Sequence, residues 1–231
     1  MSSVALVVIA KAPAPGRSKT RLCPPCTPAQ AAALAEAALS DTLAAVAACP
    51  ARRRVLALDG EPGSWLPSGF ELVEQRGNGL GERLAHALAA AGGPALVVGM
   101  DTPQLTPGLL QHAAAALGSD NVDAVLGPAL DGGYWTIGLK RPDAEVFSGI
   151  PMSDADTCRA QCGRLDELGL RWKELMPLND VDTFADARLV ARIDQRTRFA
   201  ATLQALLEHP AHHEQPMTEA APGGRLEIPY G

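Results

Sequence analysis

Two acidic turns carry the residue types that best fit a chemical reaction. The first, residues 99–103 (Gly-Met-Asp-Thr-Pro), directly follows an apolar run, residues 95–98, that we expect to form a buried strand. The second, residues 178–183 (Leu-Asn-Asp-Val-Asp-Thr), lies much later in the chain. Carboxylates just past a strand's carboxyl end commonly hold Mg²⁺ or Mn²⁺ against the phosphates of a nucleotide. The candidate metal ligands are therefore Asp101, Asp180 and Asp182, although Asp182 also fits a residue that caps the next helix.

A basic loop follows the first expected strand. Residues 11–21 (Lys-Ala-Pro-Ala-Pro-Gly-Arg-Ser-Lys-Thr-Arg) place four cations around a glycine that lets the backbone approach a ligand closely. The candidate phosphate-binding residues are Lys11, Gly16, Arg17, Lys19 and Arg21. A Walker A loop is excluded because Pro13 and Ser18 occupy the places of its two glycines. The structural alternative is a solvated basic loop.

Two glycine-rich turns complete the set of candidates. Residues 75–83 join an expected strand to an expected helix, and we expect Asn78, Gly79, Leu80 and Gly81 to border a nucleotide there. Residues 127–135 place a carboxylate, two glycines and two aromatic side chains between strands, which suits the gripping of a polar small molecule. The candidate substrate-binding residues are Asp131, Gly132, Gly133 and Tyr134. The plain alternative is a hairpin turn of the Asp-Gly type.

Apolar runs and helix-capping signals alternate along the chain. The expected strands are residues 4–10, 54–58, 70–74, 95–99, 122–126, 134–139 and 170–175. The expected helices are residues 28–49, 79–91, 106–117, 154–168 and one long helix over 183–207. This alternation predicts an α/β fold with a mostly parallel sheet and helices on both faces.

Composition narrows the class of protein. With 231 residues, 47% of them hydrophobic, we expect a single domain over residues 1–208 and an irregular or mobile tail over 209–231. A net charge of −6 is unlike that of a nucleic-acid binder.

The longest apolar stretch, residues 31–48, contains Glu36 and Asp41, so we expect no membrane span. No basic segment precedes the first strand, so we expect no signal peptide and a cytoplasmic location.

The five cysteines are an odd number, which suits a reducing compartment better than a set of disulfides. Cys23 and Cys26 could form half of a zinc site completed by Cys158 and Cys162, or a redox pair before a helix. The spacing matches either kind of site only loosely. We therefore expect two thiols in a proline-rich loop, with no assigned role.

Five segments in the same order resemble a small bacterial family of GT-A-like transferases, the selenium-domain-associated or arsenosugar-type glycosyltransferases. They are residues 9–22, 80–84, 99–103, 127–134 and 180–183, within a resemblance that covers roughly residues 4–207. More distantly, the chain is similar to the nucleotidyltransferases that make molybdenum and deazaflavin cofactors, including the 2-phospholactate enzymes. Met100 stands where the family more often has a small polar residue, and Pro103 replaces the second Asp of an Asp-x-Asp motif.

The resemblance implies a GT-A-like nucleotide-diphospho-sugar transferase fold with Mg²⁺ or Mn²⁺ near Asp101. The expected function is a metal-dependent glycosyltransferase that moves a sugar from a nucleotide-sugar donor to a small acceptor. Lys19 would assist the departing diphosphate, and Asp131 would hold the acceptor hydroxyl as a general base. The alternative is a nucleotidyltransferase that joins an NTP to a phosphorylated small molecule and releases pyrophosphate. Donor, acceptor and oligomeric state stay open.

Overall fold

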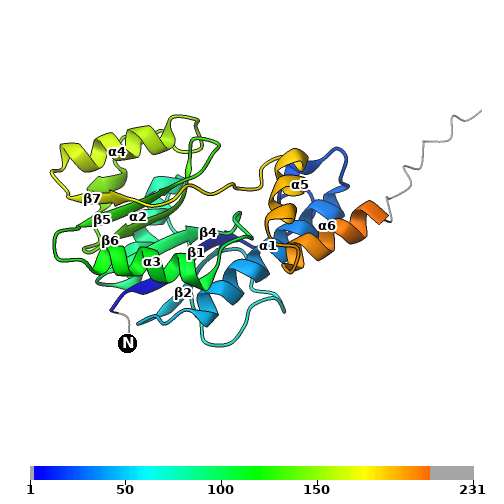
Figure 1. The fold of residues 1–231 in the computed structure, drawn as a ribbon, viewed down its shortest axis with the longest axis horizontal. Coiled ribbons are helices and arrows are strands. Elements are labelled where there is room, and N and C mark those ends of the chain that lie inside the picture. The colour runs from blue at the N-terminus through cyan, green and yellow to red at the C-terminus, as the bar shows by residue number, and fades with distance from the viewer. Residues whose placement is uncertain (1–2, 209–231) are drawn as a thin grey trace, which may run out of the picture.

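The computed structural model describes residues 3–208, whose strands form one mixed sheet of seven strands (Figure 1). The strand order is β3-β2-β1-β4-β6-β5-β7. The strands are β1 (Ala5–Lys11), β2 (Arg54–Asp59), β3 (Glu71–Glu74), β4 (Ala95–Gly99), β5 (Ala124–Pro128), β6 (Tyr134–Leu139) and β7 (Trp172–Glu174). Neighbouring strands run parallel except where β6 pairs with β4 and with β5. The predicted α/β fold with a mostly parallel sheet is therefore confirmed.

Helices cover both faces of the sheet, which explains why the central strands are apolar throughout. On one face, α1 (Pro28–Ala48) and α3 (Pro107–Gly118) pack against side chains such as Val8 and Leu96. On the other face, α2 (Leu80–Ala91), the 3-10 helix η2 (Ala144–Phe147) and α4 (Thr157–Glu167) pack against Val7 and Val97. Alternate residues of β1 and β4 thus enter two separate cores.

Helix α1 begins at a capping box and is almost entirely built into the core. Thr27 Oγ1 accepts a hydrogen bond from the Gln30 amide, and the Gln30 side chain accepts one from the Thr27 amide. By length and composition alone α1 is long and apolar enough to cross a membrane, but 67% of its apolar window is buried inside the protein. The protein core accounts for most of that apolar surface.

The prediction of one long helix over residues 183–207 is wrong. Residues 183–207 form two helices, α5 (Phe184–Ile193) and α6 (Arg198–Glu208), which lie beside α1 and away from the sheet (Figure 1). Asp194 ends α5 in an extended conformation, and Thr197 Oγ1 caps α6 by accepting from the Ala200 amide. The carboxylate of Asp41 on α1 accepts hydrogen bonds from two amides at the start of α6. Thr197 and Asp41 thus satisfy the backbone amides that are exposed where the second helix begins.

The expected tail over residues 209–231, including His212 and His213, lies outside the described residues.

Candidate active site

The carboxyl ends of the parallel strands surround a cleft of about 810 Å³. From β1 the chain continues to β2 on one side and later returns to β4 on the other, so the cleft lies where the strand order reverses. Open α/β sheets bind their ligands at such points. Most of the predicted site residues line the cleft: Lys11, Arg17, Lys19, Arg21, Gly79, Leu80, Asp101, Asp131, Gly133, Tyr134, Asp180 and Asp182. Gly16, Asn78, Gly81 and Gly132 belong to the same loops but do not line the cleft.

Backbone hydrogen bonds hold the three acidic turns together. The Val181 amide donates to Asp101 O at 2.9 Å, and the Leu130 amide donates to Leu178 O at 3.1 Å. The side-chain amide of Gln104 donates to Asn179 O. The segment between β7 and α5 therefore crosses the ends of β5 and β4, and it brings two distant acidic turns to one place.

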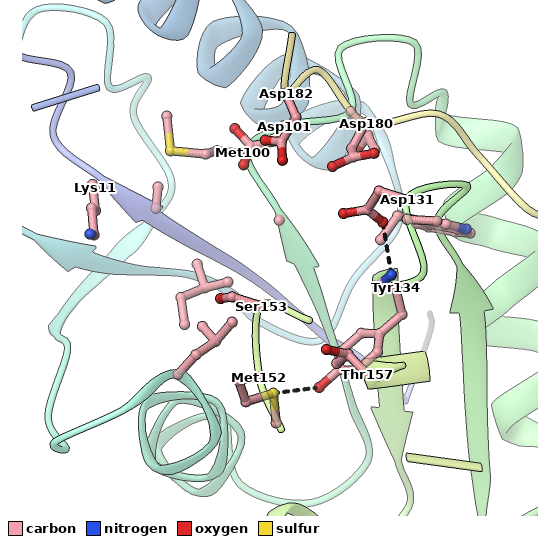
Figure 2. Close-up of a pocket in the computed structure, with 18 of the residues that line it drawn as sticks. Lys11, Met100, Asp101, Asp131, Tyr134, Met152, Ser153, Thr157, Asp180 and Asp182 are labelled. Carbon is pink, nitrogen blue, oxygen red and sulfur yellow. Dashed lines mark hydrogen bonds between the residues drawn. The ribbon is translucent and has the colours of Figure 1, made fainter. Parts of the chain in front are cut away.

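Asp131, Asp180 and Asp182 form a compact acidic cluster. Each offers a carboxylate oxygen, and these oxygens all lie within 4.8 Å of one another. Among the described residues this is the only such group of three metal-ligating side chains. Figure 2 shows the three carboxylates facing one another across the upper part of the cleft. Three hard oxygen donors at this spacing fit the preferences of Mg²⁺ or Mn²⁺.

The charge of this cluster changes the titration of its central member. Burial is the largest cause that raises the pKa of Asp180 to about 6, and the negative charges of Asp131 and Asp182 add to it. The nearby Lys19 acts in the opposite direction. A metal ion would neutralise the repulsion that raises this pKa, so the donor set fits a divalent cation.

Lys19 stands beside this cluster as a buried cation. Its ammonium lies 2.8 Å from Asp101 Oδ1 and 3.5 Å from Asp182 Oδ1, and it also donates to the carbonyl of Val181. Burial alone lowers the pKa of Lys19, but the charges of Asp101, Asp182 and Asp180 outweigh it and the pKa is raised. Asp101, predicted as a metal ligand, is thus joined to Lys19, and its part in metal binding stays a prediction.

Arg21 reaches the same carboxylates from the more exposed side. Its guanidinium lies 2.8 Å from Asp182 Oδ2 while most of the side chain remains in solvent. Lys11 and Arg17 line the cleft, and neither makes an ion pair within residues 3–208. The basic loop therefore provides two cations tied to the acidic cluster and two that are free for a ligand.

The turn that carries Asp131 is fixed by a glycine. Gly132 has a φ of +95°, and a Cβ placed on it would lie 2.0 Å from the carbonyl oxygen of Ala155. Its own carbonyl accepts a hydrogen bond from the Cys158 amide at 2.8 Å, and Asp131 Oδ1 accepts from the Gly133 amide at 2.8 Å. The Asp-Gly turn thus joins the antiparallel strands β5 and β6 at the edge of the cleft, and its predicted role in substrate binding stays a prediction.

We expect Gly132→Ala to lower the free energy of unfolding by about 3 kcal/mol. The backbone of residue 132 or of Ala155 must move to make room for the added methyl group. Urea unfolding measures the loss. Gly149→Ala is the matched control, since Gly149 also has a positive φ (+75°) but nothing within 4 Å of the added Cβ. That control should lose only about 1 kcal/mol. Equal losses in the two variants would show that the close contact with Ala155 does not matter.

A second prediction concerns Asp180 in the metal-free protein. Its folded pKa of about 6 lies above the usual value for an aspartate, so the stability it contributes is present at low pH and is lost as pH rises through 6. We expect Asp180→Asn to be more stable than wild type at pH 7.5, by about 1 kcal/mol after solvent screening, and equal to it near pH 4. Thermal unfolding with EDTA at both pH values measures this. A less stable variant at pH 7.5 would contradict the described charge repulsion.

Sequence reasoning missed two parts of the cleft wall. Residues 154–156 are part of an irregular segment, because α4 begins three residues later than predicted, at Thr157. The turn-forming pair Ser153 and Asp154 was the signal that could have shown this. On the opposite wall, Arg83 lies 3.1 Å from Asp59, and Gln75 donates to the carbonyls of Ala10 and Ala57.

All five cysteines are free thiols. Cys23 and Cys26 pack with α1, α5 and α6, whereas Cys158 and Cys162 pack against the sheet on α4. Within the described part of the chain, no group of three metal-ligating side chains includes a cysteine. The structure therefore gives no support to a zinc site that joins the two pairs.

Comparison with known proteins places the chain in a family. The model of a family described as "Uncharacterized protein conserved in bacteria (DUF2064)" matches residues 32–154, more than half of the chain. The chain belongs to the DUF2064 family. The matched region contains Asp101 and Asp131, whereas the basic loop and Asp180 lie outside it. No curated protein matches the chain.

Solved structures share the fold of this DUF2064 member. A protein of Desulfovibrio desulfuricans G20, provisionally described as a nucleotide-diphospho-sugar transferase, is 29% identical, with a TM-score of 0.81 over 90% of this chain and 96% of its own. CMP:2-keto-3-deoxy-manno-octonic acid synthetase in complex with CTP is 13% identical, with a TM-score of 0.54 over 84% of this chain and 99% of its own. Glucosyl-3-phosphoglycerate synthase of Mycobacterium tuberculosis, in complex with Mn²⁺, UDP and glucosyl-3-phosphoglycerate, is 13% identical, with a TM-score of 0.50 over 88% of this chain and 79% of its own.

The last two likenesses show the fold alone. The protein has a GT-A-like, nucleotide-diphospho-sugar transferase fold, and the predicted fold family is confirmed at that level.

Proposed function

We propose that the protein is a metal-dependent glycosyltransferase that moves a sugar from a nucleotide-sugar donor to a small acceptor. The observation that supports it most is the acidic cluster of Asp131, Asp180 and Asp182, set beside Lys19 and Arg21 in one cleft at the strand ends. The likeness to the Desulfovibrio protein supports the same reaction class, because it extends over nearly all of both chains.

In this proposal Asp180 and Asp182 of the acidic cluster would hold Mg²⁺ or Mn²⁺, which would neutralise charge on a departing diphosphate, and Asp131 would stay free of the metal. Lys19 and Arg21 lie at the edge of the cluster, where both can turn to phosphate oxygens. Lys11 and Arg17 have no ion partner within residues 3–208 and supply further positive charge on the β1 side. Each side chain thus acts by binding and orienting the donor.

Asp131 is proposed to orient and deprotonate the acceptor hydroxyl. One of its oxygens accepts the Gly133 amide, which fixes the carboxylate, while the other oxygen stays available. The acceptor oxygen would form a bond to the anomeric carbon of the sugar. The bond between that carbon and the diphosphate oxygen would break, and the diphosphate would leave with the electron pair. The hydroxyl proton would pass to Asp131.

A nucleotidyltransferase is the second candidate. The free cations Lys11 and Arg17 favour it, because a triphosphate carries more negative charge than a diphosphate sugar. In that reading the same cleft would bind an NTP and a phosphorylated small molecule and would release pyrophosphate. The two readings differ in the nucleotide that the metal-loaded cleft prefers.

Thermal unfolding with Mn²⁺ across a panel of NTPs, NDPs and NDP-sugars separates the two candidates, with EDTA as the control. A ligand at 100 times its dissociation constant adds about 2.7 kcal/mol, which for a protein of this size raises Tm by about 5–10 °C. A metal-dependent shift with one NDP-sugar that exceeds the shift with the matching NTP supports glycosyl transfer. A shift with an NTP alone would favour nucleotidyl transfer.

A further inference from the structure

The cleft has one wall whose chemistry the proposed donor does not use. We call it the acceptor wall and define it as Asp131, Tyr134, Met152, Ser153, Asp154 and Thr157, all of which line the cleft. It joins the start of β6 to the segment that leads into α4. Figure 2 shows Tyr134, Met152, Ser153 and Thr157 of this wall below the acidic cluster, to which Asp131 also belongs.

Besides its two carboxylates, the acceptor wall presents apolar groups and side-chain hydroxyl groups to the cleft. The Tyr134 hydroxyl lies 3.7 Å from Met152 Sδ and 3.4 Å from Gln161 Oε1, and both of these atoms are acceptors (Figure 2). These contacts hold the Tyr134 ring in place at the floor of the wall, beside the Met152 side chain. Leu80 and Leu84 of α2 extend the apolar surface along the cleft.

Ser153 adds a second hydroxyl in an unusual backbone conformation. Its φ is +63°, which is a strained region for a residue with a side chain, and strain of this kind concentrates at functional sites. The side chain is exposed in the cleft and makes no hydrogen bond to another described residue. The neighbouring segment cannot relax freely, because Ala155 is packed onto Gly132 and Thr157 Oγ1 donates to the Pro151 and Asp154 carbonyls.

The charge on this wall is negative. Asp131 and Asp154 belong to it, and Asp180 lies within 4.8 Å of Asp131. Every cation that lines the cleft comes from the basic loop or from Arg83 on α2. Lys19 and Arg21 are paired with the acidic turns, and Arg83 is paired with Asp59. Lys11 and Arg17 have no ion partner within residues 3–208, but they belong to the basic loop after β1 and not to the acceptor wall. A divalent metal would offset only part of this negative charge, so a phosphate monoester at the wall would be repelled.

We propose that the acceptor wall binds an unphosphorylated alcohol with an apolar group, whose hydroxyl lies near Asp131 and whose apolar part lies on Met152, Leu80 and Leu84. The inference names the acceptor class for the proposed glycosyl transfer and rests on that function. On this inference, a phosphorylated small molecule is not the substrate that binds at the acceptor wall.

Methionine methyl resonances test the binding directly and without any nucleotide. In protein labelled at the methionine methyl carbons, Met152 reports the acceptor wall, Met100 reports the donor side of the cleft, and Met176 lies outside the cleft. Met152→Leu assigns the first resonance. We expect 1-O-butylglycerol to shift Met152 with Met176 unchanged, and glycerol 3-phosphate to shift it much less at equal millimolar concentrations. A Met152 that responds more to the phosphate, or to neither probe, overturns the proposal.

The same spectra separate this inference from the proposed function. An NDP-sugar with the diamagnetic ion Mg²⁺ is expected to shift Met100, which lines the donor side near Asp101. Failure of that shift would count against the proposed function, whereas failure of the Met152 shift counts against the acceptor class. The two outcomes are observed at different methyl groups.

A charge reversal on the wall provides the matched comparison. Asp154→Lys should raise the affinity for glycerol 3-phosphate relative to 1-O-butylglycerol by about tenfold, because it replaces a repelling charge with an attracting one. Asp156→Lys makes the same change two residues away, where the exposed side chain pairs with Arg159 and does not line the cleft. Asp154→Asn keeps the side-chain oxygen that accepts the Asp156 amide. Equal effects of Asp154→Lys and Asp156→Lys would show that the wall does not select by charge.

Discussion

Replacing Asp180 by asparagine is expected to lower metal-dependent turnover of the nucleotide-sugar by about 10³-fold. Asp180 is a partly buried member of the acidic cluster, and one of its oxygens lies within 4.8 Å of a carboxylate oxygen of Asp131 and of Asp182. An amide of the same shape retains the packing but removes the charge that attracts a divalent cation. Release of the nucleoside diphosphate from the NDP-sugar, at saturating Mn²⁺, measures the loss.

Asp120→Asn is the control for this experiment. Asp120 is exposed, its side chain makes no hydrogen bond or ion pair to another described residue, and it does not line the cleft. The Asp180 variant should lose activity while its metal-free form gains stability above pH 6, so misfolding cannot account for the loss. Turnover within a factor of ten of wild type would remove Asp180 from the metal site.

Replacing Lys19 by methionine is expected to lower both stability and nucleotide affinity. The ammonium is 10% exposed and neutralises Asp101 and Asp182, so its removal leaves the acidic turns without their buried counter-ion. A fully buried pair broken in this way costs about 3–5 kcal/mol, and the partial exposure of both carboxylates reduces this to about 2 kcal/mol. The corresponding fall in Tm is about 4–8 °C.

Metal provides the diagnostic second measurement for Lys19→Met. Mn²⁺ should raise the Tm of this variant by more than it raises that of wild type, because the divalent ion replaces the charge of the lost ammonium. Lys173→Met is the matched control, since Lys173 is exposed and makes no ion pair within residues 3–208. A variant as stable as this control would show that the Lys19 ion pairs contribute little.

The regular elements were predictable because their signals are local. The strand expected at residues 95–99 is β4 with the same limits, and the helix expected from residue 28 begins there, behind the capping box of Thr27 and Gln30. The direction of β6 was not local information, because the order of the seven strands is fixed only when the whole sheet forms. The break between α5 and α6 depends on Asp41, a residue of α1 far away in the chain.

The candidate site divides in the same way. Residue types and strand ends were enough to expect Asp101, Asp131, Asp180 and the basic loop around one cleft, because carboxyl ends of parallel strands share an edge. The sequence did not show that Lys19 pairs with Asp101, or that Asp131 joins Asp180 and Asp182. Which side chains meet depends on the path of the segment after β7. Hydrogen bonds to the ends of β5 and β4 determine that path.

The central claim is that Asp180 and Asp182 hold a divalent cation against the diphosphate of a nucleotide-sugar, with Asp131 beside them. Electron–nuclear double resonance of Mn²⁺ bound to the protein with an NDP-sugar tests it directly, because ³¹P coupling to Mn²⁺ requires that the phosphates ligate the metal. The proposal predicts ³¹P coupling in wild type and in Asp120→Asn, with a large loss in Asp180→Asn. Protein-bound Mn²⁺ without ³¹P coupling, or coupling that Asp180→Asn leaves unchanged, would contradict it.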